Sequence, residues 1–280
     1  MTPADFRAAI AQALDEELAR DESVVVFGAG IAGGGLAERH GADRVFDTPV
    51  SELALAGAAF GAAVAGLRPV VAVDTLALAM DSLVNQAAPY WRRSGGQASV
   101  PLVVRAPVRA GAQLEGAPGL KIVAPSTPAD AGALLKAAVR DDNPVVFLEH
   151  ERVREIAGEA AEEPGVIGEA AVVRPGDDVT LAGAMWTVHE CLAAAEELAD
   201  DGIECEVIDM RTLRPLDART VLWSIERTNR LVVVDDGPRS GGWAAEVAAL
   251  VAQEGLGDLD DLRRIAVPDA AAIVAQVRAL

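Results

Sequence analysis

Short apolar runs that alternate with helical patterns are the feature that most constrains the fold of this chain. One series predicts strands at 24–27, 70–73, 102–104 and 145–148, with helices between them. A second series of the same kind begins near residue 179. Strands separated by helices pair in parallel and carry helices on both faces of the sheet. The sequence therefore predicts an α/β fold with two domains, each a mostly parallel sheet flanked by helices.

The boundary between the two domains is expected in the segment 156–176. This stretch is rich in Glu, Ala, Gly and Pro and has only a weak periodic pattern, which is typical of a linker. We therefore place one domain at 1–155 and the other at 177–280. A length of 280 residues suits two domains of this size.

The formal net charge of −19 limits the kinds of partner. Nucleic acids and anionic membranes attract basic surfaces, so we expect the chain to bind neither. A basic protein partner is compatible with this charge, although the charge can also serve solubility alone. No apolar run is long enough to span a bilayer and no signal peptide pattern is present, so we expect a cytoplasmic protein. Cys191 and Cys205 support neither a disulfide framework nor a thiolate metal site.

The run D-T-P-V-S-E at 47–52 places a single carboxylate, Glu52, at the start of a helix rich in Gly and Ala. The next ionisable residue is Arg68, so we expect Glu52 to be buried. A lone buried acid beside small residues can hold a proton for a ligand nitrogen, because burial disfavours its charged form. The alternative is purely structural: Thr48 caps the helix, Pro49 lies in its first turn, and Glu52 interacts with the helix dipole.

Other motifs give weaker signals. A G-x-G-x-x-G pattern at 28–33 follows a strand, as in dinucleotide-binding folds. The polar residues after it leave no long apolar helix, so a flexible glycine loop is the favoured interpretation. The three histidines lie far apart, and the sequence has no H-E-x-x-H, C-x-x-C or G-x-S-x-G pattern. Hydrolase and zinc functions are therefore not indicated.

A combination of segments in chain order resembles a known family. The segments are D-T-P-V-S-E at 47–52, G-L-R-P-V-V at 66–71, S-G-G-Q at 94–97, G-L-K-I-V-A-P-S-T-P at 119–128, R-D-D-N-P-V-V-F-L-E at 140–149 and R-T-L-R-P-L-D at 211–217. Together they resemble the β subunits of 2-oxo acid dehydrogenase E1 components of the pyruvate and branched-chain type. The resemblance covers nearly the whole chain and implies a transketolase-like pyrimidine-binding domain followed by a transketolase C-terminal domain.

The resemblance also implies a cofactor and a partner chain. In that family thiamine diphosphate binds between two chains, with its aminopyrimidine on the β subunit and its Mg²⁺-diphosphate on the α subunit. This sequence has no glycine-aspartate-glycine diphosphate motif followed by a metal-binding asparagine, as suits a chain that supplies half of a site. An E1 α-like partner in an α2β2 heterotetramer is therefore implied, together with a lipoyl acyltransferase or carrier domain.

Individual residues receive roles from the same resemblance. Glu52 corresponds to the catalytic acid that hydrogen-bonds the pyrimidine ring nitrogen and so favours the imino tautomer that activates the cofactor. Leu78 corresponds to an aromatic residue that packs on the pyrimidine. A structural K⁺ is implied in a cage of backbone carbonyls. The carbonyls belong to Leu102, Ala138, Val139, Asp141 and Asn143.

This chain departs from the family pattern around the substrate. The family's G-A-Q-H, whose histidine assists the substrate and acyl transfer, is here G-A-Q-L at 111–114, so the catalytic histidine is missing. The family's acidic loop is here G-A-G at 28–30, and the segments at 75–81 and before Gly119 are shorter. Because these losses spare Glu52, they favour an altered substrate or acceptor over decay of the site.

Three functions remain open on this basis. The first is an E1-type subunit that decarboxylates a 2-oxo acid and passes on the acyl unit. The second is a two-chain transketolase or acyloin-type carboligase, and the third is a non-catalytic scaffold subunit. In an α2β2 assembly, Gly57 and Gly61 would let helices of two β chains approach closely. The acidic run at 258–261 could dock a basic partner domain.

Overall fold

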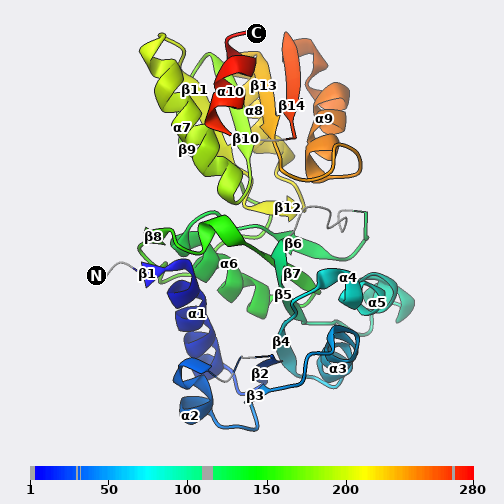
Figure 1. Cartoon of the computed structure of the whole chain (residues 1–280). Coiled ribbons are helices and arrows are strands. Elements are labelled where there is room, and N and C mark those ends of the chain that lie inside the picture. The colour runs from blue at the N-terminus through cyan, green and yellow to red at the C-terminus, as the bar shows by residue number, and fades with distance from the viewer. Residues whose placement is uncertain (1–3, 30, 32, 109–115, 267–268) are drawn as a thin grey trace. The chain divides into compact units, whose positions relative to one another are not determined.

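The structure is a computed structural model that describes residues 4–29, 31, 33–108, 116–266 and 269–280 (Figure 1). It separates into two compact units. The first comprises the chain up to Val123 and Thr127–Ile167, and the second comprises Ala124–Ser126 and Gly168–Leu280. The predicted fold class, two domains with mostly parallel sheets flanked by helices, is confirmed.

The first unit is built on parallel strands in the order β6-β7-β5-β4-β2-β3, and each neighbouring pair in this order is parallel. The strands are β2 Val24–Gly28, β3 Val45–Asp47, β4 Arg68–Ala72, β5 Val103–Val108, β6 Lys121–Val123 and β7 Val145–His150. β2 and β7 are buried along their whole length, as is typical of parallel strands that are covered on both faces. A separate antiparallel pair joins β1 Ala4–Asp5 to β8 Ala157–Gly158.

The helices of the first unit are mostly short. They are α1 Phe6–Arg20, α2 Leu36–His40, α3 Glu52–Val64, α4 Leu76–Met80, α5 Ala88–Arg93 and α6 Pro128–Arg140, with 3₁₀ turns at Gly33–Gly35 and Glu151–Val153. α1 packs against α6, and the two are joined by the buried carboxylate of Glu17, which accepts a hydrogen bond of 2.6 Å from Arg140. α3 packs against α4 and β4.

The helical segment between β4 and β5 is not α-helical throughout. A π-helix, η2 Asp81–Ala87, lies between α4 and α5. Pro89 has no N–H and cannot donate to the carbonyl of Asn85 four residues earlier. The guanidinium of Arg93 donates to that carbonyl instead, at 2.6 Å. The π-helix and Pro89 thus lie next to each other, where the regular pattern of α-helical hydrogen bonds is broken.

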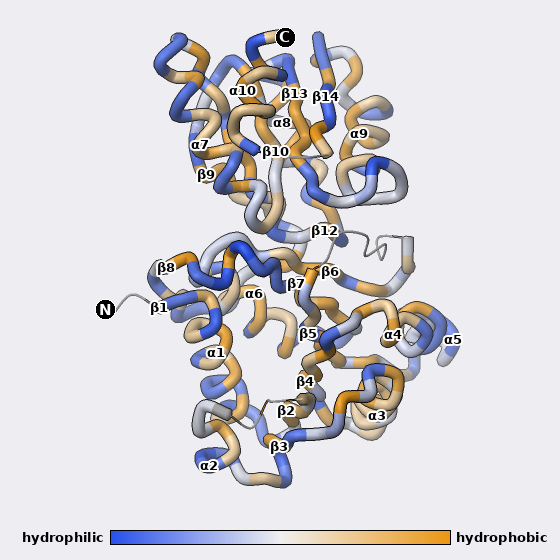
Figure 2. Tube along the Cα trace, viewed as in Figure 1, coloured by the Kyte–Doolittle hydropathy of each residue, from blue (hydrophilic) through white to orange (hydrophobic). Residues whose placement is uncertain are grey.

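The second unit holds a five-stranded sheet in the order β14-β13-β10-β11-β9. Its strands are β9 Ala171–Arg174, β10 Val179–Gly183, β11 Cys205–Asp209, β13 Arg230–Val234 and β14 Asp261–Ile265, and β12 is Thr212–Arg214. Its helices are α7 Trp186–Asp200, α8 Ala218–Thr228, α9 Trp243–Glu254 and α10 Ala270–Val277, with a 3₁₀ turn at Leu256–Asp258. Figure 2 shows apolar residues concentrated in the inner strands, and β10 and β11 are buried throughout.

The segment 156–176, interpreted as a linker, contains ordered structure. β8 lies at its start, and β9 pairs antiparallel with β11 at the edge of the second sheet. β9 is only partly buried, so its sequence lacks the continuous apolar run that marks the central strands. The division between the two units falls after Ile167. A second feature that the sequence pattern missed is that Ala124–Ser126 belongs to the second unit, where Ala124 N donates to Arg211 O at 2.8 Å.

The two cysteines lie in the core of the second unit. Cys191 on α7 and Cys205 on β11 are buried, and both thiols are free. Burial raises the pKa of Cys205 to about 11, and it raises the pKa of Cys191 further. Both thiols are therefore protonated and unreactive at neutral pH. Among the described residues, no helix combines the length and apolar character that a membrane span requires.

We predict that Gly119→Ala destabilises the first unit. Gly119 has φ +92°, and a Cβ there would lie 2.1 Å from the carbonyl oxygen of Ala88. The free energy of unfolding should fall by more than the ~1–2 kcal/mol that a left-handed backbone alone costs, as measured by urea denaturation. Gly257→Ala is the matched control, because Gly257 has nothing within 4 Å of its added Cβ. Equal stability of the two variants would contradict this prediction.

Candidate active site

The approach to α3 is set by the sheet. Thr48 N donates to Gly28 O at 3.1 Å and so continues the pairing of β3 with β2 beyond the last paired residues. The chain then turns, and α3 begins at Glu52 with Ser51 as its N-cap residue, which makes no side-chain capping bond. Thr48 and Pro49 precede the helix. The sequence also allowed a purely structural role for this segment, with Thr48 as the cap and Pro49 in the first turn. Both of these assignments are wrong, because the N-cap residue is Ser51 and the helix begins at Glu52.

Glu52 is buried, as the sequence predicts. It is 6% exposed and continues the buried stripe of α3 that contains Ala56, Ala59 and Ala63. No hydrogen bond or ion pair reaches its carboxylate from the residues that the structure describes. The carboxylate is therefore available to a donor from outside the chain. The Oγ1 atom of Thr48 is also buried without a partner.

An apolar surface surrounds the start of α3. Val50 is 64% exposed and Leu53 is 59% exposed on either side of Glu52. Next to them is a cavity of about 610 Å³ between α3 and strands β2 and β3, whose wall includes Thr48, Pro49 and Ser51. At this cavity the rings of Phe27 and Phe46 stack 5.2 Å apart. An exposed apolar surface of this kind is typical of an interface with a ligand or a second chain.

Leu78 lies on α4, which packs against α3. Its side chain is 56% exposed, so it is free to contact a ligand or another chain. Its role beside a pyrimidine ring stays a prediction. The loop at 111–114, where the family's histidine is missing, lies outside the described residues, as does Gly30.

Two of the five residues assigned to a K⁺ cage, Val139 and Asp141, contact the side chain of Arg68 through their carbonyls. Segments 100–102 and 142–145 run side by side, with Val100 N donating to Asp142 O and Val145 N to Leu102 O. Between β4 and the end of α6, the guanidinium of Arg68 donates to the carbonyls of Val139 and Asp141, each at 3.1 Å. Sequence patterns do not reveal this contact, because it joins residues that are 71 and 73 positions apart.

The carboxylate of Asp141 belongs to the same turn. Burial alone would raise its pKa, but hydrogen bonds from Lys121 and from Asn143 outweigh burial and hold the pKa below its ordinary value. Asn143 donates from both its backbone N–H and its side-chain amide, at 2.8 and 2.9 Å. The turn is therefore ordered by charged side chains on two strands. Arg68 therefore contacts two of the carbonyls assigned to K⁺, and the K⁺ site itself stays a prediction.

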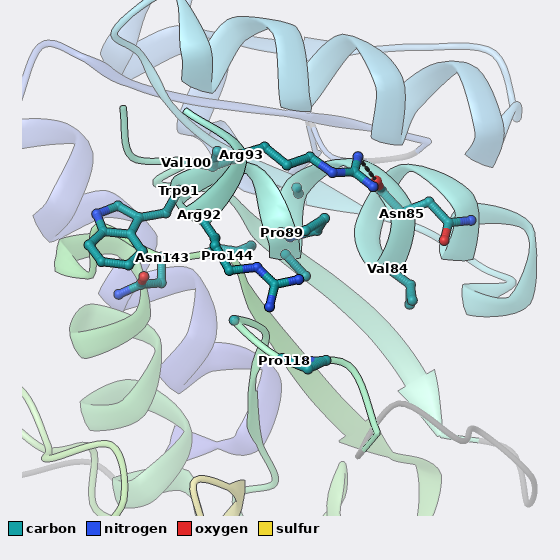
Figure 3. A pocket seen from close by; sticks show the side chains of 13 residues that line it. Val84, Asn85, Pro89, Trp91, Arg92, Arg93, Val100, Pro118, Asn143 and Pro144 are labelled. Carbon is teal, nitrogen blue, oxygen red and sulfur yellow. Dashed lines mark hydrogen bonds between the residues drawn. The ribbon is translucent and has the colours of Figure 1, made fainter. Parts of the chain in front are cut away.

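A second cavity lies where this turn meets η2 and α5 (Figure 3). It measures about 450 Å³, and its lining includes Arg92, Pro118 and Asn143. Figure 3 shows Arg93 turned away toward Asn85, to which it is hydrogen-bonded. Nothing in this cavity supplies a buried acid, base or nucleophile, so it is a weaker candidate for chemistry than the start of α3.

The remaining motifs have structural roles. His40 pairs with Asp15 at 2.7 Å, and His189 Nε2 contacts Ser126 O at 2.9 Å. The glycine pattern after β2 is followed by a helix of five residues only, α2, which favours the interpretation as a glycine loop over a dinucleotide site. In the described part of the chain, no group of three or more His, Cys, Asp or Glu side chains could hold a metal ion.

Two family models match the chain. Residues 2–154 match the model for the transketolase pyrimidine binding domain, and residues 168–278 match the model for the transketolase C-terminal domain. A split gene transketolase, solved as an inactive beta4 tetramer, is similar over 98% of this chain and 97% of its own, with a TM-score of 0.84 and 20% identity. At that identity the likeness supports the fold alone.

Several similar proteins are named as beta subunits of oxidoreductases and dehydrogenases. The beta subunit of acetoin:2,6-dichlorophenolindophenol oxidoreductase from Cupriavidus necator is 41% identical over 91% of this chain and 85% of that protein. The mitochondrial pyruvate dehydrogenase E1 component subunit beta of Dictyostelium discoideum is 41% identical over 91% and 80%. The 2-oxoisovalerate dehydrogenase subunit beta of Bacillus subtilis is 41% identical over 93% and 88%.

We predict that Glu52→Met leaves the free chain as stable or makes it more stable, by up to about 3 kcal/mol, because it removes an unpaired buried carboxyl group. Urea denaturation at neutral pH measures this. If Glu52 only stabilises the helix end, the same change should instead cost about 0.3–1 kcal/mol. Thr127→Ala is the positive control, because Thr127 Oγ1 caps α6 by accepting from Asp130 N at 3.1 Å, and its loss should cost about 0.5–2 kcal/mol.

Proposed function

This chain belongs to the family of β subunits of 2-oxo acid dehydrogenase E1 components, and we propose that it is the pyrimidine-binding half of a two-chain, thiamine diphosphate-dependent enzyme. The proposed reaction is the decarboxylation of a 2-oxo acid with transfer of the acyl unit. The observation that supports this proposal is the state of Glu52. Its side chain is 6% exposed, and its carboxylate has no partner among the described residues. The Glu52 carboxyl group can therefore form a hydrogen bond with a ring nitrogen of a bound ligand.

The start of α3 fits the aminopyrimidine of the cofactor. The unpaired carboxyl of Glu52 would form a hydrogen bond with the pyrimidine ring nitrogen and hold a proton between the two atoms. The unpaired hydroxyl of Thr48 lies in the same turn and offers a further polar contact. The exposed side chain of Leu78 offers an apolar face for the ring. When bound, thiamine diphosphate supplies a nucleophilic carbon and an electron sink for decarboxylation.

The apolar environment of Glu52 supports its role as a proton carrier. The carboxyl group lies on a helix face that otherwise carries leucine and alanine. A site of this kind excludes water and strengthens each hydrogen bond that a ligand makes within it. The residues of this chain therefore bind and orient the pyrimidine and set its protonation.

A partner chain is part of the proposal. The exposed side chains of Val50, Leu53 and Phe46 surround the start of α3, which is a large apolar surface for a protein with a net charge of −19. We propose that an E1 α-like subunit covers this surface and binds the Mg²⁺-diphosphate half of the cofactor, in an α2β2 assembly. Gly61 lies on the exposed side of α3, where a second copy of the helix could approach closely. A lipoyl acyltransferase or carrier domain would accept the acyl unit.

A carboligase or two-chain transketolase is the second candidate. The observation that favours it is Leu114, which stands where the family's histidine assists the 2-oxo acid and the acyl acceptor. Leucine can neither donate nor accept a proton, so the acceptor step of a dehydrogenase would lack that group. A scaffold role would require partner binding without any dependence on Glu52.

We predict that Glu52→Gln in the co-purified two-chain complex lowers thiamine diphosphate-dependent turnover by about 10²–10⁴-fold, the usual contribution of a positioned acid or base. Steady-state kinetics on the preferred substrate measure this. Glu22→Gln, at an exposed glutamate of the same unit, should leave turnover unchanged. Activity of Glu52→Gln within tenfold of the unmodified complex would remove Glu52 from the mechanism. If the complex binds no cofactor by calorimetric titration, the scaffold role is favoured instead.

We predict further that the complex releases CO₂ from a 2-oxo acid in the presence of an artificial electron acceptor. A panel of pyruvate and branched-chain 2-oxo acids, tested against ketose phosphates under the same conditions, separates the two enzymatic candidates. Consumption of ketose phosphates without CO₂ release would contradict the dehydrogenase-type proposal and support the transketolase-type one.

A further inference from the structure

We infer that the guanidinium of Arg68 is the built-in cation of the turn at 138–143, so that this chain is stabilised without K⁺. This inference does not depend on the proposed function, because it concerns the stability of the fold. It concerns the carbonyls at which the family resemblance implies a metal ion.

The position of Arg68 carries the inference. A single nitrogen, Nη1, lies 3.1 Å from the carbonyl oxygen of Val139 and 3.1 Å from that of Asp141. These two oxygens are among the ligands assigned to K⁺. The second nitrogen, Nη2, donates to the carboxylate of Asp142 at 2.7 Å. A positively charged group thus already lies between the carbonyls that a metal ion would have to bridge.

Two further carbonyls of the implied cage also accept hydrogen bonds. Ala138 O accepts from Asp141 N at 3.3 Å, and Leu102 O accepts from Val145 N at 2.8 Å. A carbonyl has two lone pairs, so these bonds alone do not exclude a metal ion. They show that backbone N–H groups and the Arg68 guanidinium provide hydrogen-bond donors to the carbonyls of the turn. These carbonyls therefore have partners without an ion.

Both side-chain cations at the turn are paired with carboxylates. Arg68 and Lys121 are the cations, and they face the carboxylates of Asp141, Asp142 and Asp21. Lys121 pairs with Asp141, and Arg68 pairs with Asp142, with Asp21 3.9 Å from its Nε. A K⁺ ion at the same carbonyls would lie beside the guanidinium and be repelled by it.

The backbone fixes Arg68 in place. Arg68 N donates to Ser23 O at 2.8 Å, where β4 begins beside β2. Its side chain is 24% exposed, so most of it is shielded from water. A planar guanidinium can donate to two carbonyls and a carboxylate at once, which a lysine ammonium on a flexible chain does less well.

The test is thermal unfolding of the full chain in potassium, sodium and choline chloride at equal ionic strength. The unmodified chain should have the same apparent Tm in all three salts. Arg68→Met and Arg68→Ala should lower it by about 5 °C in choline, and K⁺ should restore at least half of that loss while Na⁺ restores less. Arg7→Ala, at an exposed arginine on α1, is the control for loss of one charge and should not change the Tm.

Two results would overturn the inference. A Tm of the unmodified chain that rises in K⁺ but not in choline would show that the ion binds beside Arg68. Failure of K⁺ to stabilise both Arg68→Met and Arg68→Ala would show that the guanidinium does not occupy a cation position. Because the measurement needs neither cofactor nor partner chain, its outcome is independent of the Glu52 experiments.

Discussion

The position of Glu52 is the constraint on which the candidate site in the first unit depends. Its side chain is buried at the start of α3 and has no partner among the described residues. The parallel sheet, whose β2 and β7 are fully buried, supports this position, and α3 packs against α4 and β4. Rigid elements thus hold one polar group in a defined position, as is usual where a protein binds a ligand.

The parallel direction of the strands explains where this group lies. β2, β3 and β4 end on the same edge of the sheet, and α3 starts from the turn that follows β3. In open α/β sheets, ligands bind at this edge because loops there can be shaped without disturbing the core. The apolar side chains exposed around the same turn are what a chain needs if a second polypeptide completes the site. The acidic net charge thus coexists with a local apolar surface at the start of α3.

Much of this could be predicted from the sequence, and the exceptions have physical causes. The central strands and the burial of Glu52 follow from local patterns, because long apolar runs and a small-residue helix each allow few structures. The π-helix was missed because it results from the absent N–H of Pro89, whose effect appears at Asn85. β9 was missed because an edge strand is half exposed. The role of Arg68 was missed because its partners are more than 70 residues away in sequence, and periodicity carries no information on such contacts.

The two thiols in the core of the second unit have a practical consequence. Cys191 and Cys205 are shielded from solvent, and burial raises the pKa of both, so alkylating reagents can reach them only when the sheet and α7 separate. Since the sequence contains no other cysteine, the rate of labelling reports the opening of that unit alone. The two cysteines are thus a natural probe of local unfolding in the second unit, and the first unit, which has no cysteine, stays unlabelled.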